Sequence, residues 1–178
     1  GPEHADRIII SSPVLSNSKM QQLRDVEKER EGYGVVDIDL NYAEAEGLQA
    51  AIARICEETA QAVRDGKTLI VLTDKKFREG FLPANSALAT GAVHHHLIKT
   101  GLRTDANILV ETGFARDPHQ FAVLLGFGAT AVYPYLAYDV INDLVAKGEL
   151  LGDPIHAQAN FRKGIEKGLL KVLSKMGI

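Results

Sequence analysis

The chain has 178 residues, of which 46% are hydrophobic and 24% charged, and this length and composition suit one globular domain with a buried core. A net charge of −3 at pH 7 excludes the basic footprint of a nucleic-acid partner, and no apolar run approaches the roughly 20 residues that cross a membrane. The single cysteine, Cys56, excludes an intrachain disulfide and a cysteine-built zinc or iron–sulfur site, so we expect a cytoplasmic location.

Short β-branched segments alternate with longer helical patterns along the chain. Each short segment is nearly continuous in apolar residues, as is typical of parallel strands covered by helices. The predicted strands are residues 7–11, 35–40, 68–73, 107–111 and 131–133. The predicted helices are residues 18–31, 43–65, 85–100, 118–125, 138–146 and 156–175.

Residues with capping preferences support these boundaries. Either Ser16 or Asn17 can cap the first helix, and Glu44 and Glu46 would place negative charge in the first turn of the second. Glycines stand at helical ends, where a left-handed residue is favoured: Gly32, Gly66, Gly101 and Gly126.

Serial βα units predict an α/β fold with a parallel sheet. Two architectures remain open: a doubly wound open sheet and an eightfold barrel, which normally takes about 250 residues, so that this chain would form only a partial barrel. No Ser/Pro/Gly linker, charge block or low-complexity segment divides the chain, and we therefore expect a single domain over residues 1–178.

Three adjacent histidines, His94, His95 and His96, suggest a metal site. Neighbouring residues on a helix point about 100° apart, whereas a chelating pair needs i, i+4 spacing. We therefore expect no metal; instead, one histidine would face the core with a hydrogen bond and another would contact a neighbouring domain.

Two acids, Asp74 and Glu111, stand at the carboxyl ends of predicted strands, where α/β folds usually assemble active sites. Asp37 and Asp39 alternate with apolar residues, which places both on one face as an acid/base pair or at a sheet rim that meets solvent or a partner domain. Ordinary ion pairs or helix caps offer a simpler explanation of the first two acids: Lys75, Lys76 and Arg78 lie near Asp74, and Arg116 lies near Glu111.

Glycines in the segment GFGAT, residues 126–130, resemble a phosphate-binding loop, but they follow a helix and precede a strand, the reverse of such loops. We expect a tight turn there. Asp117 before Pro118 is a strong helix start, and its carboxylate disfavours an anion at that helix terminus.

Other candidates favour packing over chemistry. Cys56 lies within an amphipathic helix, where a buried apolar role is common. The aromatic residues Tyr133, Tyr135 and Tyr138 either close the core or pack against another domain, and we favour packing.

Four segments together resemble the later part of the central domain of the glutamate synthase large (alpha) subunit. They are PEHADRIIISSPVLS (2–16), LPANSALATGAVHHHLIKTGLR (82–103), VETGFARDPHQFAVLLGFGATAVYPYL (110–136) and KGLLKVLSKMGI (167–178). The series covers essentially the whole chain. One departure is Thr73-Asp74-Lys75, where many relatives carry Ser-Asp-Arg.

The resemblance implies a degenerate, partial TIM-barrel-like domain that joins a glutaminase domain to an FMN-binding domain and helps enclose the ammonia path. It implies FMN and an iron–sulfur cluster for the full-length oxidoreductase, and no catalytic, cofactor or metal residue within this chain. Residues 155–178 would be the connector helix toward the FMN-binding domain. Exposed apolar surface is expected where the missing domains dock, with self-association of the excised piece. The rival interpretation is an independent small β/α enzyme using Asp74, Glu111 or His94–His96.

Overall fold

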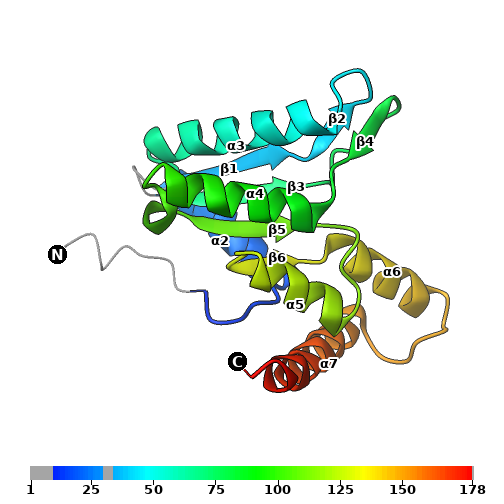
Figure 1. Cartoon of the computed structure of the whole chain (residues 1–178). Helices are drawn as coiled ribbons and strands as arrows, with labels where there is room; N and C mark the ends of the chain where they lie inside the picture. Colours follow the sequence, from blue (N-terminus) through cyan, green and yellow to red (C-terminus); the bar gives the residue numbers. More distant parts are fainter. Residues whose placement is uncertain (1–9, 30–33, 178) are drawn as a thin grey trace.

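A four-stranded parallel sheet lies at the centre of the computed structural model, which describes residues 10–29 and 34–177. Its strands lie side by side in the order β1, β3, β5, β6, so the order advances in one direction (Figure 1). They are β1 (Val35–Asp39), β3 (Leu69–Thr73), β5 (Asn107–Glu111) and β6 (Ala131–Tyr133). A separate antiparallel ribbon pairs β2 (Asn41–Ala43) with β4 (Phe81–Pro83).

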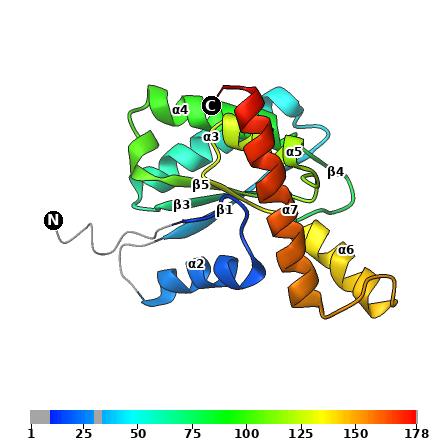
Figure 2. The ribbon, with the colours of Figure 1, turned by 90° about the horizontal axis from the view of Figure 1, so that it is seen from below.

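Helices cover both faces of the sheet (Figure 2). α2 lies on one face, and α3, α4 and α5 lie on the other, while α7 packs along α5 and α6. The helices are α2 (Asn17–Glu29), α3 (Leu48–Arg64), α4 (Ser86–Lys99), α5 (Pro118–Gly126), α6 (Tyr135–Ala146) and α7 (Pro154–Lys175). A short 3-10 turn, η1 (Arg103–Asp105), precedes β5.

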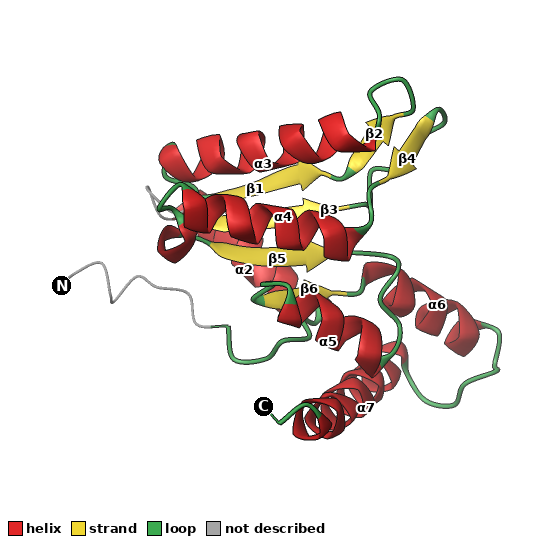
Figure 3. Ribbon diagram, in the orientation of Figure 1, coloured by secondary structure: helices red, strands yellow, loops and turns green. Residues whose placement is uncertain are grey.

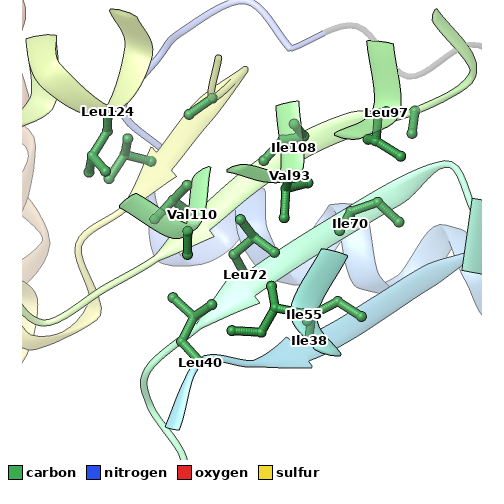
Figure 4. Packing of buried hydrophobic residues seen from close by; sticks show 14 of the residues in the cluster. Ile38, Leu40, Ile55, Ile70, Leu72, Val93, Leu97, Ile108, Val110 and Leu124 are labelled. Carbon is green, nitrogen blue, oxygen red and sulfur yellow. The ribbon is translucent and has the colours of Figure 1, made fainter. Parts of the chain in front are cut away.

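Side chains alternate across each strand, and this alternation builds two apolar layers. Ile70, Leu72, Ile108 and Val110 point toward α3, α4 and α5 and are fully buried there (Figure 4). The intervening residues of the same strands meet Leu15, Met20 and Leu23 on and before α2. The almost continuous apolar strands in the sequence therefore reflect burial on both faces.

The α/β class, the parallel sheet and four of the five predicted strands are confirmed. Residues 7–9 of the first predicted strand lie outside the described residues, and Ile10 and Ser11 are not in a strand. Instead, Val14 forms a single parallel bridge with Val132, placing the N-terminal segment beside β6. α2 then carries the chain under the sheet to β1 at the opposite edge (Figure 2).

Three helix-boundary predictions are wrong, one of them the start of α6, which begins at Tyr135 and not at Tyr138. α3 begins at Leu48, because Asn41–Ala43 forms β2 (Figure 3), so Glu44 and Glu46 lie in the turn before the helix. Gly126 is the last residue of α5, and the left-handed residue after that helix is Gly128, with φ 119°. Gly66 and Gly101 do have positive φ, as expected, while Gly32 lies outside the described residues. Ser16 accepts a hydrogen bond from the backbone N–H of Lys19.

The described strands form an open sheet with covered faces. Their one-directional order is that of a barrel segment, since a doubly wound sheet reverses its order at a switch point. However, α2 covers the face that would line a barrel interior. The relation to a partial barrel stays a prediction.

Candidate functional site

The carboxyl edge of the sheet carries a buried acid, Asp74, only 4% exposed directly after β3. Its Oδ2 accepts a hydrogen bond from the Thr112 hydroxyl at 2.6 Å, and its Oδ1 accepts from the Gly113 N–H at 3.1 Å and the Tyr135 hydroxyl at 2.7 Å. These donors follow β5 and β6 in the chain. Asp74 therefore ties together the loops after three parallel strands.

This network corrects one prediction from the sequence. The neighbouring cations Lys75, Lys76 and Arg78 do not supply the hydrogen bonds that hold the Asp74 carboxylate. Arg78 pairs instead with Asp39, at 3.0 Å between Nη1 and Oδ2. Burial explains the difference, because hydroxyl and amide donors from adjacent strand ends reach a carboxylate without taking another full charge out of water.

Glu111, at the end of β5, is the second buried acid, with 5% exposure. Its Oε1 accepts from the Thr73 hydroxyl at 2.6 Å, and its Oε2 lies 3.7 Å from Nη2 of Arg24. The predicted cation, Arg116, is not its ion-pair partner; the Arg116 backbone N–H donates to Gln120 instead. The cation comes from α2, far away in the sequence.

Arg24 also forms an ion pair with Asp37 on β1, so that it lies between Glu111 and Asp37. Its guanidinium donates to both carboxylate oxygens of Asp37, at 2.9 and 3.2 Å. Asp39 has different partners, since it accepts from the backbone and side chain of Asn41 and from Arg78. Because Asp37 and Asp39 are held by separate cations, an acid/base pair between them receives no support.

Two tyrosines at this edge are kept protonated. Burial raises the pKa of Tyr135 far above its ordinary value, and the bond and charge of Asp74 raise it further. Burial and the nearby charge of Glu111 raise the pKa of Tyr133 to about 12. Tyr138, 1% exposed, closes the core and donates its hydroxyl to the Leu15 carbonyl at 2.6 Å. These hydroxyls act as hydrogen-bond donors near neutral pH.

The histidines lie at the opposite edge of the sheet, near the end of α4. His94 accepts a 2.9 Å hydrogen bond at Nδ1 from Nε of Arg103, which also donates to the carbonyls of Ala106 and Gly128. Burial and the Arg103 charge lower the pKa of His94. His95 is exposed, while Nε2 of His96 lies 3.7 Å from Glu57. One histidine is thus hydrogen-bonded within the fold, as expected.

Neither Cys56 nor the N-terminus of α5 fits the cofactors that the sequence resemblance implies. Cys56 is the single cysteine, it is buried in α3, and burial raises its thiol pKa; iron–sulfur clusters are normally held by several thiolates. A flavin phosphate at the N-terminus of α5 would meet the Asp117 carboxylate, which forms a capping box with Gln120. Within residues 10–29 and 34–177, no group of three or more His, Cys, Asp or Glu is arranged to hold a metal ion.

A cavity of about 270 Å³ lies between the N-terminal segment and α7. Its polar lining includes Ser12, Lys19, Arg162 and Glu166, and the Ser12 hydroxyl donates to Glu166 at 2.7 Å. No sequence pattern points to these residues, because they come from opposite ends of the chain. No local motif joins them.

A family model described as the glutamate synthase central domain matches residues 1–178. The chain belongs to the glutamate synthase central domain family. It is 40% identical over 95% of its length to the NADPH glutamate synthase large chain of Azospirillum brasilense. It is 38% identical over its full length to the chloroplastic ferredoxin-dependent enzyme of rice, Oryza sativa. It is 34% identical over 97% of its length to the NADH glutamate synthase of Saccharomyces cerevisiae.

The chain spans 9 to 12% of the length of each of these three relatives. The family assignment confirms the sequence resemblance. Among the described helices of the domain, none is long and apolar enough to cross a membrane.

Proposed function

We propose that this chain is a noncatalytic scaffold domain of a glutamate synthase large chain. It would join the glutaminase and FMN-binding domains and help enclose the ammonia path for glutamate formation from glutamine and 2-oxoglutarate. The family match over residues 1–178 supports the context. The chain's small share of its relatives' length, about a tenth, leaves room for catalytic domains elsewhere.

The engagement of Asp74 is the observation that carries the proposal. A carboxylate that acts as a general acid or base must lie within reach of the substrate. Asp74 occupies the usual place for such a group, but it is 4% exposed and accepts bonds from Thr112, Gly113 and Tyr135. Its interactions serve to fix three loops relative to one another, which is what a rigid spacer between two domains requires.

A physical reason for such a spacer follows from the chemistry of ammonia. Ammonia released into water at neutral pH is largely protonated and no longer a nucleophile. A passage between two distant sites must therefore stay dry and keep a constant shape. A sheet covered on both faces, with loops held by buried hydrogen bonds, supplies walls that keep their shape.

The remaining features follow from the same proposal. Residues 155–178 would form the connector toward the FMN-binding domain, with α7 (Pro154–Lys175) as its helical part. FMN and the iron–sulfur cluster would be held by the flanking domains, in agreement with the poor fit of Cys56 and Asp117 to either group. We propose a cytoplasmic location, although several plant relatives are named as chloroplastic.

The first test uses the purified 178-residue chain. Its absorbance spectrum and native mass are recorded, and glutaminase and glutamate-forming activities are assayed with and without added FMN. A colourless, metal-free, cooperatively folding and inactive protein is the expected result. Bound flavin, bound metal or turnover would overturn the scaffold proposal and favour an independent β/α enzyme that uses Asp74, Glu111 or His94–His96.

A second test uses the complete large chain carrying Asp74→Asn. This substitution keeps the shape of the side chain but replaces one acceptor oxygen with a donor, so the loop network loosens. We expect more glutamine to be hydrolysed for each glutamate formed. Asp143→Asn is the matched control, because Asp143 is exposed and pairs only with Lys147 in the described structure. An unchanged ratio in a folded Asp74→Asn enzyme would contradict a role of this edge in enclosing ammonia.

A further inference from the structure

The exposed part of the loop between β3 and β4, residues 75–80, combines charge with an aromatic side chain. Its sequence, Lys75-Lys76-Phe77-Arg78-Glu79-Gly80, has three cations and one acid, a net charge of +2 in a chain whose net charge is −3. Phe77 is 71% exposed. Single exposed apolar residues are ordinary on protein surfaces, so exposure of Phe77 alone indicates nothing.

A second loop at the same edge repeats this combination. Phe114, after β5, is 60% exposed, and Arg116 beside it is exposed as well. β3 and β5 are adjacent parallel strands, so their carboxyl ends and the loops that follow lie next to each other. We call five exposed residues of these two loops, Lys75, Lys76, Phe77, Phe114 and Arg116, the carboxyl-edge face.

Buried hydrogen bonds hold the two loops of the carboxyl-edge face in place. Asp74 precedes Lys75 and holds the Thr112 hydroxyl and the Gly113 N–H, while the Phe114 N–H donates to Thr112 at 3.1 Å. Lys75 lies 5.6 Å from the ring of Tyr135, which also bonds to Asp74. The two exposed aromatic residues thus stand on loops joined by a shared buried carboxylate.

The first loop is held from its other end as well. The Arg78 guanidinium lies 3.6 Å from the ring of Phe81 and pairs with Asp39. Its Nη1 also donates to the Lys76 carbonyl at 2.9 Å. An exposed loop fixed in this way loses little entropy when a partner binds, so more of the contact energy appears as affinity.

We propose that the carboxyl-edge face docks an acidic segment with apolar side chains from the part of the same polypeptide outside residues 1–178. This inference rests on the proposed scaffold function and deepens it by naming the surface. The lysines and Arg116 would pair with carboxylates, and Phe77 and Phe114 would contact apolar side chains. Aromatic residues and arginine are both enriched at interfaces. About nine-tenths of the length of the relatives lies outside the matched region.

Lysine acetylation followed by mass spectrometry tests whether the face is covered. The rates at Lys75 and Lys76 are compared between the complete large chain and the 178-residue chain. Docking is expected to slow acetylation of Lys76 about tenfold, in line with the protection that local burial confers. An unchanged rate at Lys76 overturns the proposal. If acetylation is slowed at Lys163 or Lys171 of α7 but not at Lys76, docking at the carboxyl-edge face is refuted and the scaffold function stands. If acetylation is slowed at none of these lysines, both proposals are contradicted.

Zero-length carbodiimide cross-linking identifies what covers the face, because it joins a lysine only to a carboxylate in direct contact. Links from Lys75 or Lys76 to Asp or Glu outside residues 1–178 of the same polypeptide are expected. Links to residues 1–178 of a second copy, or links confined to Glu79, overturn the proposal.

A charge-reversal variant supplies the independent check. Lys76→Glu with Phe77→Ser should raise acetylation at Lys75 in the complete chain toward its rate in the 178-residue chain. Ile98→Ser with Lys99→Glu is the matched control at the opposite edge, where Ile98 is 54% exposed and Lys99 is exposed too. An equal effect of both variants, or of neither, contradicts docking at the carboxyl edge.

Discussion

Substitution of Gly168 by alanine tests the close contact between α7 and α5. Gly168 lies within α7, and a Cβ atom built there would come 2.7 Å from the Cβ of Pro118, the first residue of α5. The proline ring is fixed to its own backbone and cannot swing aside. The neighbouring Gly164 is in the same helix, and a Cβ there would have no atom within 4 Å.

Helix propensity and packing predict changes of opposite sign in the free energy of unfolding when Gly168 is replaced by alanine. Replacing a glycine in a helix interior by alanine stabilises by about 1 kcal/mol. Overpacking a close contact destabilises by about 1–3 kcal/mol. We therefore expect Gly168→Ala to lower the free energy of unfolding by about 0–2 kcal/mol. Gly164→Ala should raise it by about 1 kcal/mol, since only the propensity term applies.

Urea unfolding followed by far-ultraviolet circular dichroism measures both values on the 178-residue chain. The expected difference between the two variants, about 1–3 kcal/mol, corresponds to roughly 2–4 °C in melting temperature for each kcal/mol. If Gly168→Ala stabilises as much as Gly164→Ala, α7 does not pack on Pro118 and the reasoning fails. An unchanged m value in both variants checks that unfolding stays two-state.

Three further predictions concern one buried and two half-buried polar groups. Asp74→Ala leaves three donors without their acceptor and should cost at least about 3 kcal/mol in urea unfolding, whereas Asp143→Ala at an exposed i, i+4 pair should cost under about 0.5 kcal/mol. Because the pKa of His94 is lowered in the folded state, its contribution to stability is present above pH 6.5 and is lost as the pH falls through the folded pKa. His94→Gln should flatten this decline in the free energy of unfolding, and an unaltered dependence of that free energy on pH would refute the prediction. The pKa of Tyr133 is raised to about 12, so its contribution holds below pH 10 and is lost as the pH rises to about 12; an alkaline absorbance titration of wild type against Tyr133→Phe measures this.

Local sequence signals predicted the helices and the central strands because they depend on neighbouring residues. Asn85 accepts from the Leu88 N–H and Asp117 accepts from the Gln120 N–H, as capping preferences indicate. Continuous apolar runs placed β3 and β5 correctly. The ribbon of β2 and β4 was missed, since neither Asn-Tyr-Ala nor Phe-Leu-Pro contains a β-branched residue, whereas β6, which has the same length, contains Val132.

The partners of the buried acids could not be predicted in this way. Lys75, Lys76 and Arg78 are the sequence neighbours of Asp74, yet its hydrogen bonds come from residues 112, 113 and 135. Proximity in sequence favours ion pairs on a surface, while burial selects donors that adjacent strand ends bring together. Arg24, and not Arg116, approaches Glu111 because α2 packs against the sheet beside β5, a contact between segments far apart in the sequence.

The sequence by itself determined the α/β class, the starts of α4 and α5 and the family, because each depends on local periodicity, capping chemistry or a long ordered series of matching residues. Only the tertiary structure decided that the N-terminal segment lies beside β6, that α2 covers one face of the sheet, and that Asp74 is a link between loops. Those facts depend on which distant segments pack together, and packing is set by shape and burial over the whole chain, which no local pattern records.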